Sequence, residues 1–351
     1  MPTAVKRLAF VDALKAVASQ LIVLHHLAFY GPMSDVANDL APELFFWLSK
    51  NARVAVQVFL VIGGFLAAKA LAPAGQLTAS SPLVLIRKRY FKLVLPYAAA
   101  VLFSIFSAAI ARHLMDHDSI PDPPTGWQLL AHIALLQSIL GFDSLSAGVW
   151  YIAIDFQLFS LFLLMLWLAR GVGHAYVRAS TVGITLVTAL ALASLFAFNR
   201  DADWDNWALY FFAAYALGVL AYWASRSEAK TGWLLVMAGV VAVALSVDFR
   251  SRIAVALLTA LALGSAQRWH FIDSRPRSAL LAYLGKISYS VFLVHFSVIL
   301  VVNAVFSRFA ADNPTANALG IILAWVASTA VGALFYRLVE SHTAGWLAST
   351  S

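Results

Sequence analysis

Long apolar stretches separated by short polar segments make up nearly the whole chain. An apolar stretch of about 20 residues is long enough to cross a bilayer as an α-helix. The pattern therefore predicts an all-α, polytopic integral membrane protein with about ten transmembrane helices. The predicted spans are residues 10–29, 54–71, 93–111, 148–168, 180–198, 207–223, 232–247, 253–266, 284–306 and 317–336.

Charged residues between the spans predict the topology. Loops on the cytoplasmic side carry an excess of Lys and Arg. Alternate loops of this chain are basic, and they contain Lys6 and Arg7, then Arg87 to Lys92, Arg170 and Arg178, Arg226 and Lys230, and Arg268 to Arg277. Both termini are therefore predicted to be cytoplasmic. If the apolar stretch 127–142 crossed the membrane, Arg170 and Arg178 would lie outside, so we interpret that stretch as re-entrant or interfacial on the outer side.

Composition strengthens the membrane assignment and removes several kinds of site. Hydrophobic residues make up 62% of the 351 residues and charged residues only 12%, with a mean hydropathy of +0.82. Such a chain cannot hide its apolar surface from water, so its solvent is lipid. The net charge of +7 lies in short loops and indicates topology rather than nucleic-acid binding.

The composition and the spacing of its residues predict neither a metal centre nor a second domain. Cysteine is absent, so a disulfide, a thiolate nucleophile and a cysteine metal site are all excluded. The scattered histidines lack metal-ligand spacing, so we predict no metal. The polar stretches are loop-sized, and we interpret residues 1–351 as a single transmembrane domain with no attached soluble domain.

The first span contains the residues that point to chemistry. Ionisable side chains inside a span are costly and usually mark a pathway or a reaction centre. Lys15 and His26 lie roughly 16 Å apart along one helix, with Lys15 near the cytoplasmic surface. Asp155 falls at a depth similar to that of His26, and a histidine paired with a carboxylate is suited to act as a general base. His25 points about 100° away from His26, so we interpret it as a packing neighbour.

Each of these residues also has a purely structural interpretation. A histidine in a span often forms only an interhelical hydrogen bond, and this applies to His26 and to His295 in the middle of the ninth span. Lys15 near a helix end can snorkel to the interface. The basic run 87–92 is either a topology signal or a phosphate-binding patch. The adjacent Gly63 and Gly64 indicate close helix packing.

Several segments together resemble the acyltransferase-3 family of bacterial membrane acyltransferases. They occur in the family's order and cover nearly the whole chain: residues 12–26 with a basic residue eleven positions before a His, 58–66, 87–96 ending in Pro, 150–157 with a Trp-to-acid motif, 287–295 ending in His, and 336–340. The chain departs from the family pattern at Lys15 (Arg is usual), Gly63 (Ser), Asp155 (Glu), Phe159 (Tyr) and His342 (Pro). Lys15 is the most consequential departure, because Lys cannot reproduce a bidentate guanidinium contact.

The resemblance implies transfer of an acyl group, commonly acetyl from acetyl-CoA, to a hydroxyl of a surface or exported glycan at the bacterial inner membrane. It implies that His26 is catalytic and that the donor is bound by basic residues, namely Lys15, Arg87, Arg89 and Lys92. Asp155 is expected to hold His26. Candidate substrate contacts are Trp150, Tyr289 and His295, and candidate partners are membrane lipids and the machinery of polysaccharide biosynthesis or export.

Three questions stay open on the sequence alone. His26 can act as a base in direct transfer or as the carrier in a covalent acyl-histidine. A proton-coupled transporter would also use intramembrane His, Asp and Lys residues. A non-catalytic assembly partner of an export system is a third possibility.

Overall fold

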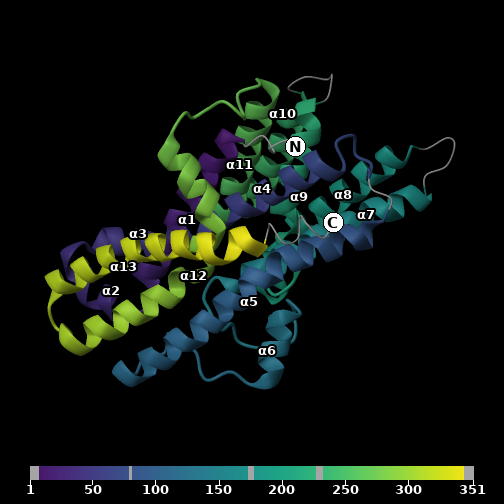
Figure 1. Cartoon of the computed structure of the whole chain (residues 1–351). Helices are drawn as coiled ribbons and strands as arrows, with labels where there is room; N and C mark the ends of the chain where they lie inside the picture. Colours follow the sequence, from purple (N-terminus) through teal and green to yellow (C-terminus); the bar gives the residue numbers. More distant parts are fainter. Residues whose placement is uncertain (1–7, 79–80, 173–177, 227–231, 344–351) are drawn as a thin grey trace. The chain divides into compact units, whose positions relative to one another are not determined.

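The computed structural model describes residues 8–78, 81–172, 178–226 and 232–343, and every regular element within these ranges is helical (Figure 1). Lys6, Arg7 and Lys230, which contributed to the predicted topology, lie outside the described residues. The α-helices are α1 (Ala9–Phe29), α2 (Pro32–Ala37), α3 (Pro42–Asn51), α4 (Val56–Leu71), α5 (Pro82–Leu114), α6 (Gly126–Ile133), α7 (Val149–Val172), α8 (Ala179–Phe196), α9 (Ala208–Arg226), α10 (Gly232–Val247), α11 (Ser251–Arg268), α12 (Ala279–Phe309) and α13 (Pro314–Phe335). Short 3₁₀ turns lie at Asn38–Leu40, Ala52–Ala55, Phe198–Arg200 and Ala202–Trp204, and a π-helical turn, Tyr336–Glu340, follows α13.

The helices confirm the all-α, polytopic prediction. Each of the ten predicted spans falls on one helix: α1, α4, α5 and then α7 to α13. Eight helices in the described part of the chain are long and apolar enough to cross a membrane. The other two predicted spans correspond to α10, which is apolar but only 16 residues long, and to α11, which is not among those eight.

The apolar stretch 127–142 contains one short helix rather than a span. Helix α6 has eight residues, which rise about 12 Å and cannot cross a bilayer as a helix. It begins with a capping box between Thr125 and Gln128. The side chains of Trp127 and Leu130 are exposed, as expected for a segment that lies in an interface.

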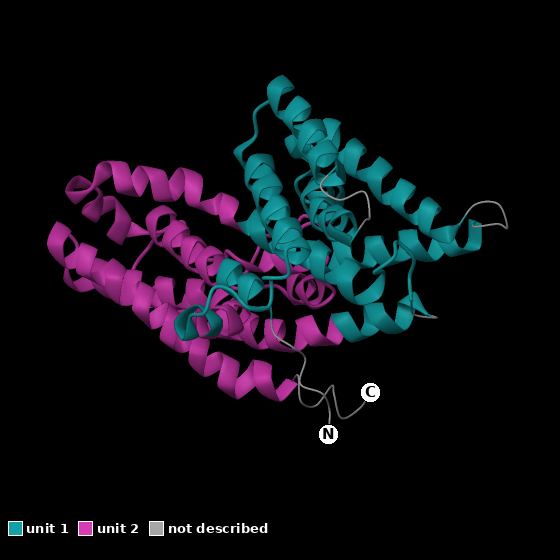
Figure 2. Ribbon diagram, turned by 90° about the horizontal axis from the view of Figure 1, so that it is seen from above, with its two compact units in different colours: residues 1–15, 56–89, 154–282 teal, residues 16–55, 90–153, 283–351 magenta. Residues whose placement is uncertain are grey.

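The chain divides into two compact units (Figure 2). Unit 1 consists of residues 1–15, 56–89 and 154–282, and unit 2 of residues 16–55, 90–153 and 283–351. Unit 1 contains α4 and α8 to α11 in full, and unit 2 contains α2, α3, α6 and α13 in full.

Two glycines bring α4 and α9 into backbone contact in unit 1. A Cβ atom on Gly64 would lie 1.9 Å from the carbonyl oxygen of Tyr215, and one on Gly218 would lie 1.9 Å from that of Val61. Small residues at such positions let transmembrane helices approach closely. Close packing matters in lipid because the hydrophobic effect does not drive the helices together there. The packing role predicted for Gly64 is thereby confirmed.

We expect Gly64→Ala to destabilise unit 1, because the added methyl must push α4 away from α9. Overpacking of this kind costs about 1–3 kcal/mol. The matched control is Gly239→Ala in α10, where a Cβ atom would meet nothing within 4 Å. Thermal unfolding in detergent should show a lower midpoint for Gly64→Ala and an unchanged or slightly higher one for Gly239→Ala. Equal midpoints would contradict the close approach.

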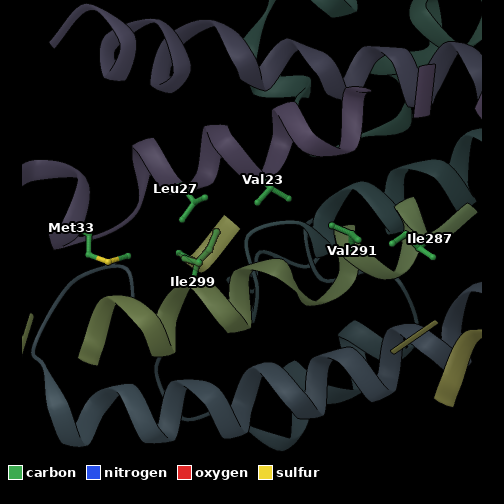
Figure 3. Close-up of a cluster of buried hydrophobic side chains, with 7 residues drawn as sticks. Val23, Leu27, Met33, Ile287, Val291 and Ile299 are labelled. Carbon is green, nitrogen blue, oxygen red and sulfur yellow. The ribbon is translucent and has the colours of Figure 1, made fainter. Parts of the chain in front are cut away.

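Unit 2 is built on contacts between α1, α12 and their neighbours. A buried apolar cluster joins Val23 and Leu27 of α1 to Val291 and Ile299 of α12 (Figure 3). Ile287, Met33 and Ala324 complete the cluster. The apolar faces of α1 and α12 therefore meet along the part of α1 that contains His25 and His26.

Candidate active site

His26 and His295 form a buried hydrogen-bonded pair. Nδ1 of His26 lies 2.6 Å from Nε2 of His295, and the two ring planes are within 7° of parallel. His295 is fully buried and His26 is 8% exposed. Leu27 and Val291, which belong to the apolar cluster of unit 2, lie one residue after His26 and four residues before His295 (Figure 3). The ring of Tyr30 lies 5.5 Å from that of His26 and the ring of Phe292 lies 5.9 Å from that of His295, measured between centroids, and a buried hydrogen bond of this kind is strong.

A second contact holds α1 and α12 in register beyond the pair. The side chain of Asn303 donates to the carbonyl of Tyr30 and accepts from the backbone N–H of Met33. It fits there because residue 31 is glycine: a Cβ atom on Gly31 would lie 2.4 Å from Nδ2 of Asn303. Tyr30, the residue directly after the end of α1 and four positions after His26, is thus fixed to α12 independently of the histidines.

His295 is held by its own helix. Its Nδ1 lies 3.1 Å from the carbonyl oxygen of Val291 and 2.8 Å from that of Phe292. Helix α13 packs against this turn, because Gly332 leaves room for Val291: a Cβ atom on Gly332 would lie 2.4 Å from Cγ2 of Val291. The ring of His295 therefore has a fixed orientation toward His26.

His25 has different partners from His26, as its position on the helix predicts. Its Nδ1 lies 3.1 Å from the carbonyl oxygen of Leu48 at the end of α3, and its ring contacts Phe29. The rings of His25 and His26 are also neighbours, with centroids 5.0 Å apart. The hydrogen bond of His25 joins α1 to α3.

Asp155 forms an ion pair with Arg89 in unit 1. Oδ2 of Asp155 lies 2.5 Å from Nη2 of Arg89 within unit 1, and the side chain of Asp155 is 6% exposed. The guanidinium carbon of Arg89 lies 5.3 Å from the ring centroid of Phe159. A guanidinium compensates a buried carboxylate better than a neutral imidazole does.

The remaining basic candidates differ in exposure. Arg87, Lys88 and Lys92 are exposed on α5, whereas Arg89 is partly buried. Lys15 is half-buried on α1, three residues after the buried Asp12. Arg87 and Lys92 are therefore the more accessible cations, and Arg89 already holds a carboxylate.

The aromatic candidates in unit 2 have structural contacts. The hydroxyl of Tyr289 donates to the carbonyl of Leu93 over 3.1 Å and so joins α12 to α5. Trp150 is half-buried and lies edge-on to Tyr151, with ring centroids 6.3 Å apart. Neither contact tests a substrate role, so both residues stay candidates.

A cavity of about 400 Å³ lies in unit 1 between α8, α9 and α10. Its walls are apolar side chains, including Leu192, Leu217, Trp223 and Val240, with Thr188 among them. No ionisable residue lines it. The cavity is suited to hydrocarbon, and none of the candidate site residues contributes to it.

His132 in α6 shows how a buried histidine outside the predicted spans is satisfied. Its Nδ1 contacts the carbonyl of Gln128, and its Nε2 accepts from the backbone N–H of Leu145. Burial lowers the pKa of His132, although the hydrogen bond to Gln128 opposes that shift.

The described residues contain no group of three or more His, Cys, Asp or Glu side chains that could hold a metal ion.

A family model described as an acyltransferase domain matches residues 8–337. The chain belongs to the acyltransferase-3 family. The match spans α1 to the start of the turn after α13, so it includes His26, Asp155 and His295 of this acyltransferase. No curated protein and no solved structure matches the chain.

Two features of this membrane acyltransferase escaped the sequence analysis. The pairing of His26 with His295 joins residues 269 positions apart, and the signals that marked His295 were its place in the middle of a span and the family motif that ends at it. Ser290 donates to Oε2 of Glu340 over 2.5 Å, which connects the penultimate motif to the C-terminal one. The segments 287–295 and 336–340, which resemble motifs of the family, each contain a polar residue. Those two polar residues were the signal in the sequence for the second contact.

Proposed function

We propose that this membrane acyltransferase moves an acetyl group from cytoplasmic acetyl-CoA to a hydroxyl of a surface or exported glycan in the bacterial inner membrane. The observation that carries the proposal is His26: an ionisable side chain inside a span, held by a second histidine on a neighbouring helix. A fixed imidazole in an apolar surrounding is suited to general-base catalysis near neutral pH.

The reaction balances with His26 as the base. The acceptor hydroxyl gives its proton to His26 while its oxygen attacks the thioester carbonyl carbon. The carbon–sulfur bond then breaks, and the CoA thiolate takes the proton from His26. The products are the acetylated acceptor and CoA, and His26 returns to its neutral form.

A covalent acetyl-histidine is the second route, and one experiment separates the two. Incubating the purified protein with labelled acetyl-CoA in the absence of an acceptor, followed by rapid quenching, would leave label on His26 only in the covalent route. We favour direct transfer, because the His26–His295 pair already provides a base with a defined orientation.

The donor is proposed to meet the exposed basic residues of α5. CoA is anionic, and the forks of Arg suit its phosphates. Arg87 and Lys92 are exposed on α5, whereas the guanidinium of Arg89 is bound to Asp155. We therefore propose that Arg87 and Lys92 contact the donor directly. Arg89 is assigned a structural role, because its ion pair with Asp155 holds α5 in place. Lys15 is assigned to the donor through the family resemblance.

We expect Arg87→Ala and Lys92→Ala to raise the KM for acetyl-CoA by about three- to tenfold each, with little change in kcat. Loss of one charge-assisted contact removes about 1 kcal/mol of binding in this accessible setting. The measurement is steady-state transfer of labelled acetyl to an added acceptor, and Lys88→Ala on the same exposed segment is the comparison. An unchanged KM in both variants would remove the donor assignment.

Two proposals, that Trp150 contacts the substrate and that the acceptor is a glycan, rest on the family resemblance and on the aromatic residues of the outer loops. Mass spectrometry of surface glycans from wild-type and deletion cells tests the class directly. Loss of an acetyl group from a glycan in the deletion strain is the expected result. Proton-gradient-driven accumulation of a solute by vesicles, without any need for acetyl-CoA, would instead favour a transporter.

A further inference from the structure

The hydrogen bonds of His295 determine where its proton lies. Nδ1 of His295 faces the carbonyl oxygens of Val291 and Phe292, at 3.1 and 2.8 Å. A carbonyl oxygen only accepts hydrogen bonds, so Nδ1 must carry the proton. In a neutral imidazole the other nitrogen then has a lone pair. Nε2 of His295 is therefore an acceptor.

The protonation of His295 in turn fixes that of His26. Nδ1 of His26 lies 2.6 Å from the acceptor Nε2 of His295, so Nδ1 of His26 must donate. The two ring centroids are 4.9 Å apart, and the two hydrogen-bonded nitrogens are 2.6 Å apart. The difference is about twice the distance from the centre of an imidazole ring to one of its nitrogens, so the two nitrogens lie on the line that joins the ring centres. The hydrogen bond therefore lies along the line between the rings, which are nearly parallel. This is the direction in which an N–H and a ring lone pair point.

The opposite arrangement needs a buried charge. His26 could accept only if His295 carried protons on both nitrogens. A cationic His295 would then lie fully buried beside two carbonyls and a second imidazole. A charge buried without an opposite charge is strongly unfavourable. The neutral arrangement is the stable resting state.

We propose that His295 is a positioning residue that holds His26 in its Nδ1–H form, so that Nε2 of His26 is the atom that takes the proton from the acceptor hydroxyl. This inference rests on the proposed function of His26. When Nε2 gains that proton, the ring becomes an imidazolium whose Nδ1–H still donates to His295, which stabilises the charge until the proton passes to the CoA sulfur. His295, itself held by the carbonyls of Val291 and Phe292, has toward His26 the role that a carboxylate has in many histidine-based sites.

Two substitutions at residue 295 separate positioning from packing. The amide oxygen of Gln in His295→Gln can accept from Nδ1 of His26, whereas His295→Phe fills the space with a ring that cannot. We expect His295→Phe to lower kcat by about 100-fold with the KM for acetyl-CoA unchanged within about twofold, and His295→Gln to retain kcat within about tenfold. Equal kcat values for the two variants would overturn the inference.

Nitrogen-15 NMR of the wild-type protein tests the inference without an activity measurement. Histidine labelled in both ring nitrogens gives well-separated signals for protonated and unprotonated nitrogens, and the His26 signals are assigned by their loss in His26→Asn. We expect a protonated Nδ1 and an unprotonated Nε2 in His26 at neutral pH. His132 is an internal reference, because its backbone contacts require the same form.

The outcomes distinguish this inference from the proposed function. A protonated Nε2 in His26 overturns the inference, even if His26 proves essential for transfer. The expected NMR pattern together with full transfer activity in His26→Asn would leave the tautomer correct and overturn the proposed function. If His295→Phe fails to fold, the NMR measurement on the wild type still decides between the two forms.

Discussion

We expect His26→Asn to lower the rate of acetyl transfer by about 10²- to 10⁴-fold while the protein remains folded. The amide nitrogen of Asn can replace Nδ1 and donate to His295, so the contact between α1 and α12 is kept. No atom replaces Nε2, so no base is present. General-base catalysis contributes rate factors of this size. His26→Ala removes both the base and the hydrogen bond, and we expect it to abolish transfer and to lower the unfolding midpoint as well.

The matched control for His26 is the adjacent histidine. In His25→Asn the amide nitrogen takes the place of Nδ1, which contacts the carbonyl of Leu48. We expect this variant to keep transfer activity within about threefold, because the hydrogen bond of His25 goes to Leu48 of α3, whereas the one to His295 comes from His26. Transfer is measured with labelled acetyl-CoA on purified protein whose folding has been checked by thermal unfolding. Undiminished turnover in His26→Asn would remove the central claim.

The fold was predictable because a bilayer permits few alternatives. Backbone polar groups in lipid must be satisfied within the chain, so apolar segments of spanning length become helices. Helix ends were less predictable. Helix α5 begins at Pro82, well before the predicted start at residue 93, and α12 begins at Ala279 rather than at 284. Hydropathy marks the hydrocarbon region, whereas a helix continues through basic residues into the interface.

The residues that contact His26 and Asp155 in the structure could not be predicted from the sequence. Position along a span predicts similar depths for His26 and Asp155, but it does not reveal that His26 contacts His295 or that Asp155 contacts Arg89. Rotation of each helix about its axis decides which side chains meet, and that rotation follows from packing between helices distant in sequence. Gly332, which lets α13 approach Val291, is one such determinant.

Charge patterns similarly group residues that the structure separates. The run 87–92 indicates a cytoplasmic loop, and by that rule its basic residues are equivalent. In the structure Arg89 turns inward to Asp155, while Arg87 and Lys92 remain exposed. The spacing of a basic run cannot reveal this difference, because it depends on a carboxylate that comes 66 residues later in the chain.

We expect Arg89→Met to destabilise the protein more than Asp155→Asn does. Removing the guanidinium leaves the carboxylate of Asp155 buried without its charge partner, and breaking a buried pair in this way costs about 3–5 kcal/mol. Removing the carboxylate charge leaves Arg89, whose side chain is already 29% exposed and can extend to the membrane surface. Thermal unfolding in detergent should rank the midpoints as wild type, Asp155→Asn and then Arg89→Met. The reverse order of the two variants would contradict this asymmetry.

The double variant Arg89→Met with Asp155→Leu decides whether this pair is structural or takes part in the reaction. Apolar side chains of similar volume can replace a buried ion pair without loss of stability. We therefore expect the double variant to regain most of the stability that Arg89→Met loses, and to transfer acetyl within about tenfold of wild type, because the carboxylate of Asp155 is bound to Arg89. A folded double variant as inactive as His26→Ala would assign Asp155 to the chemical step itself.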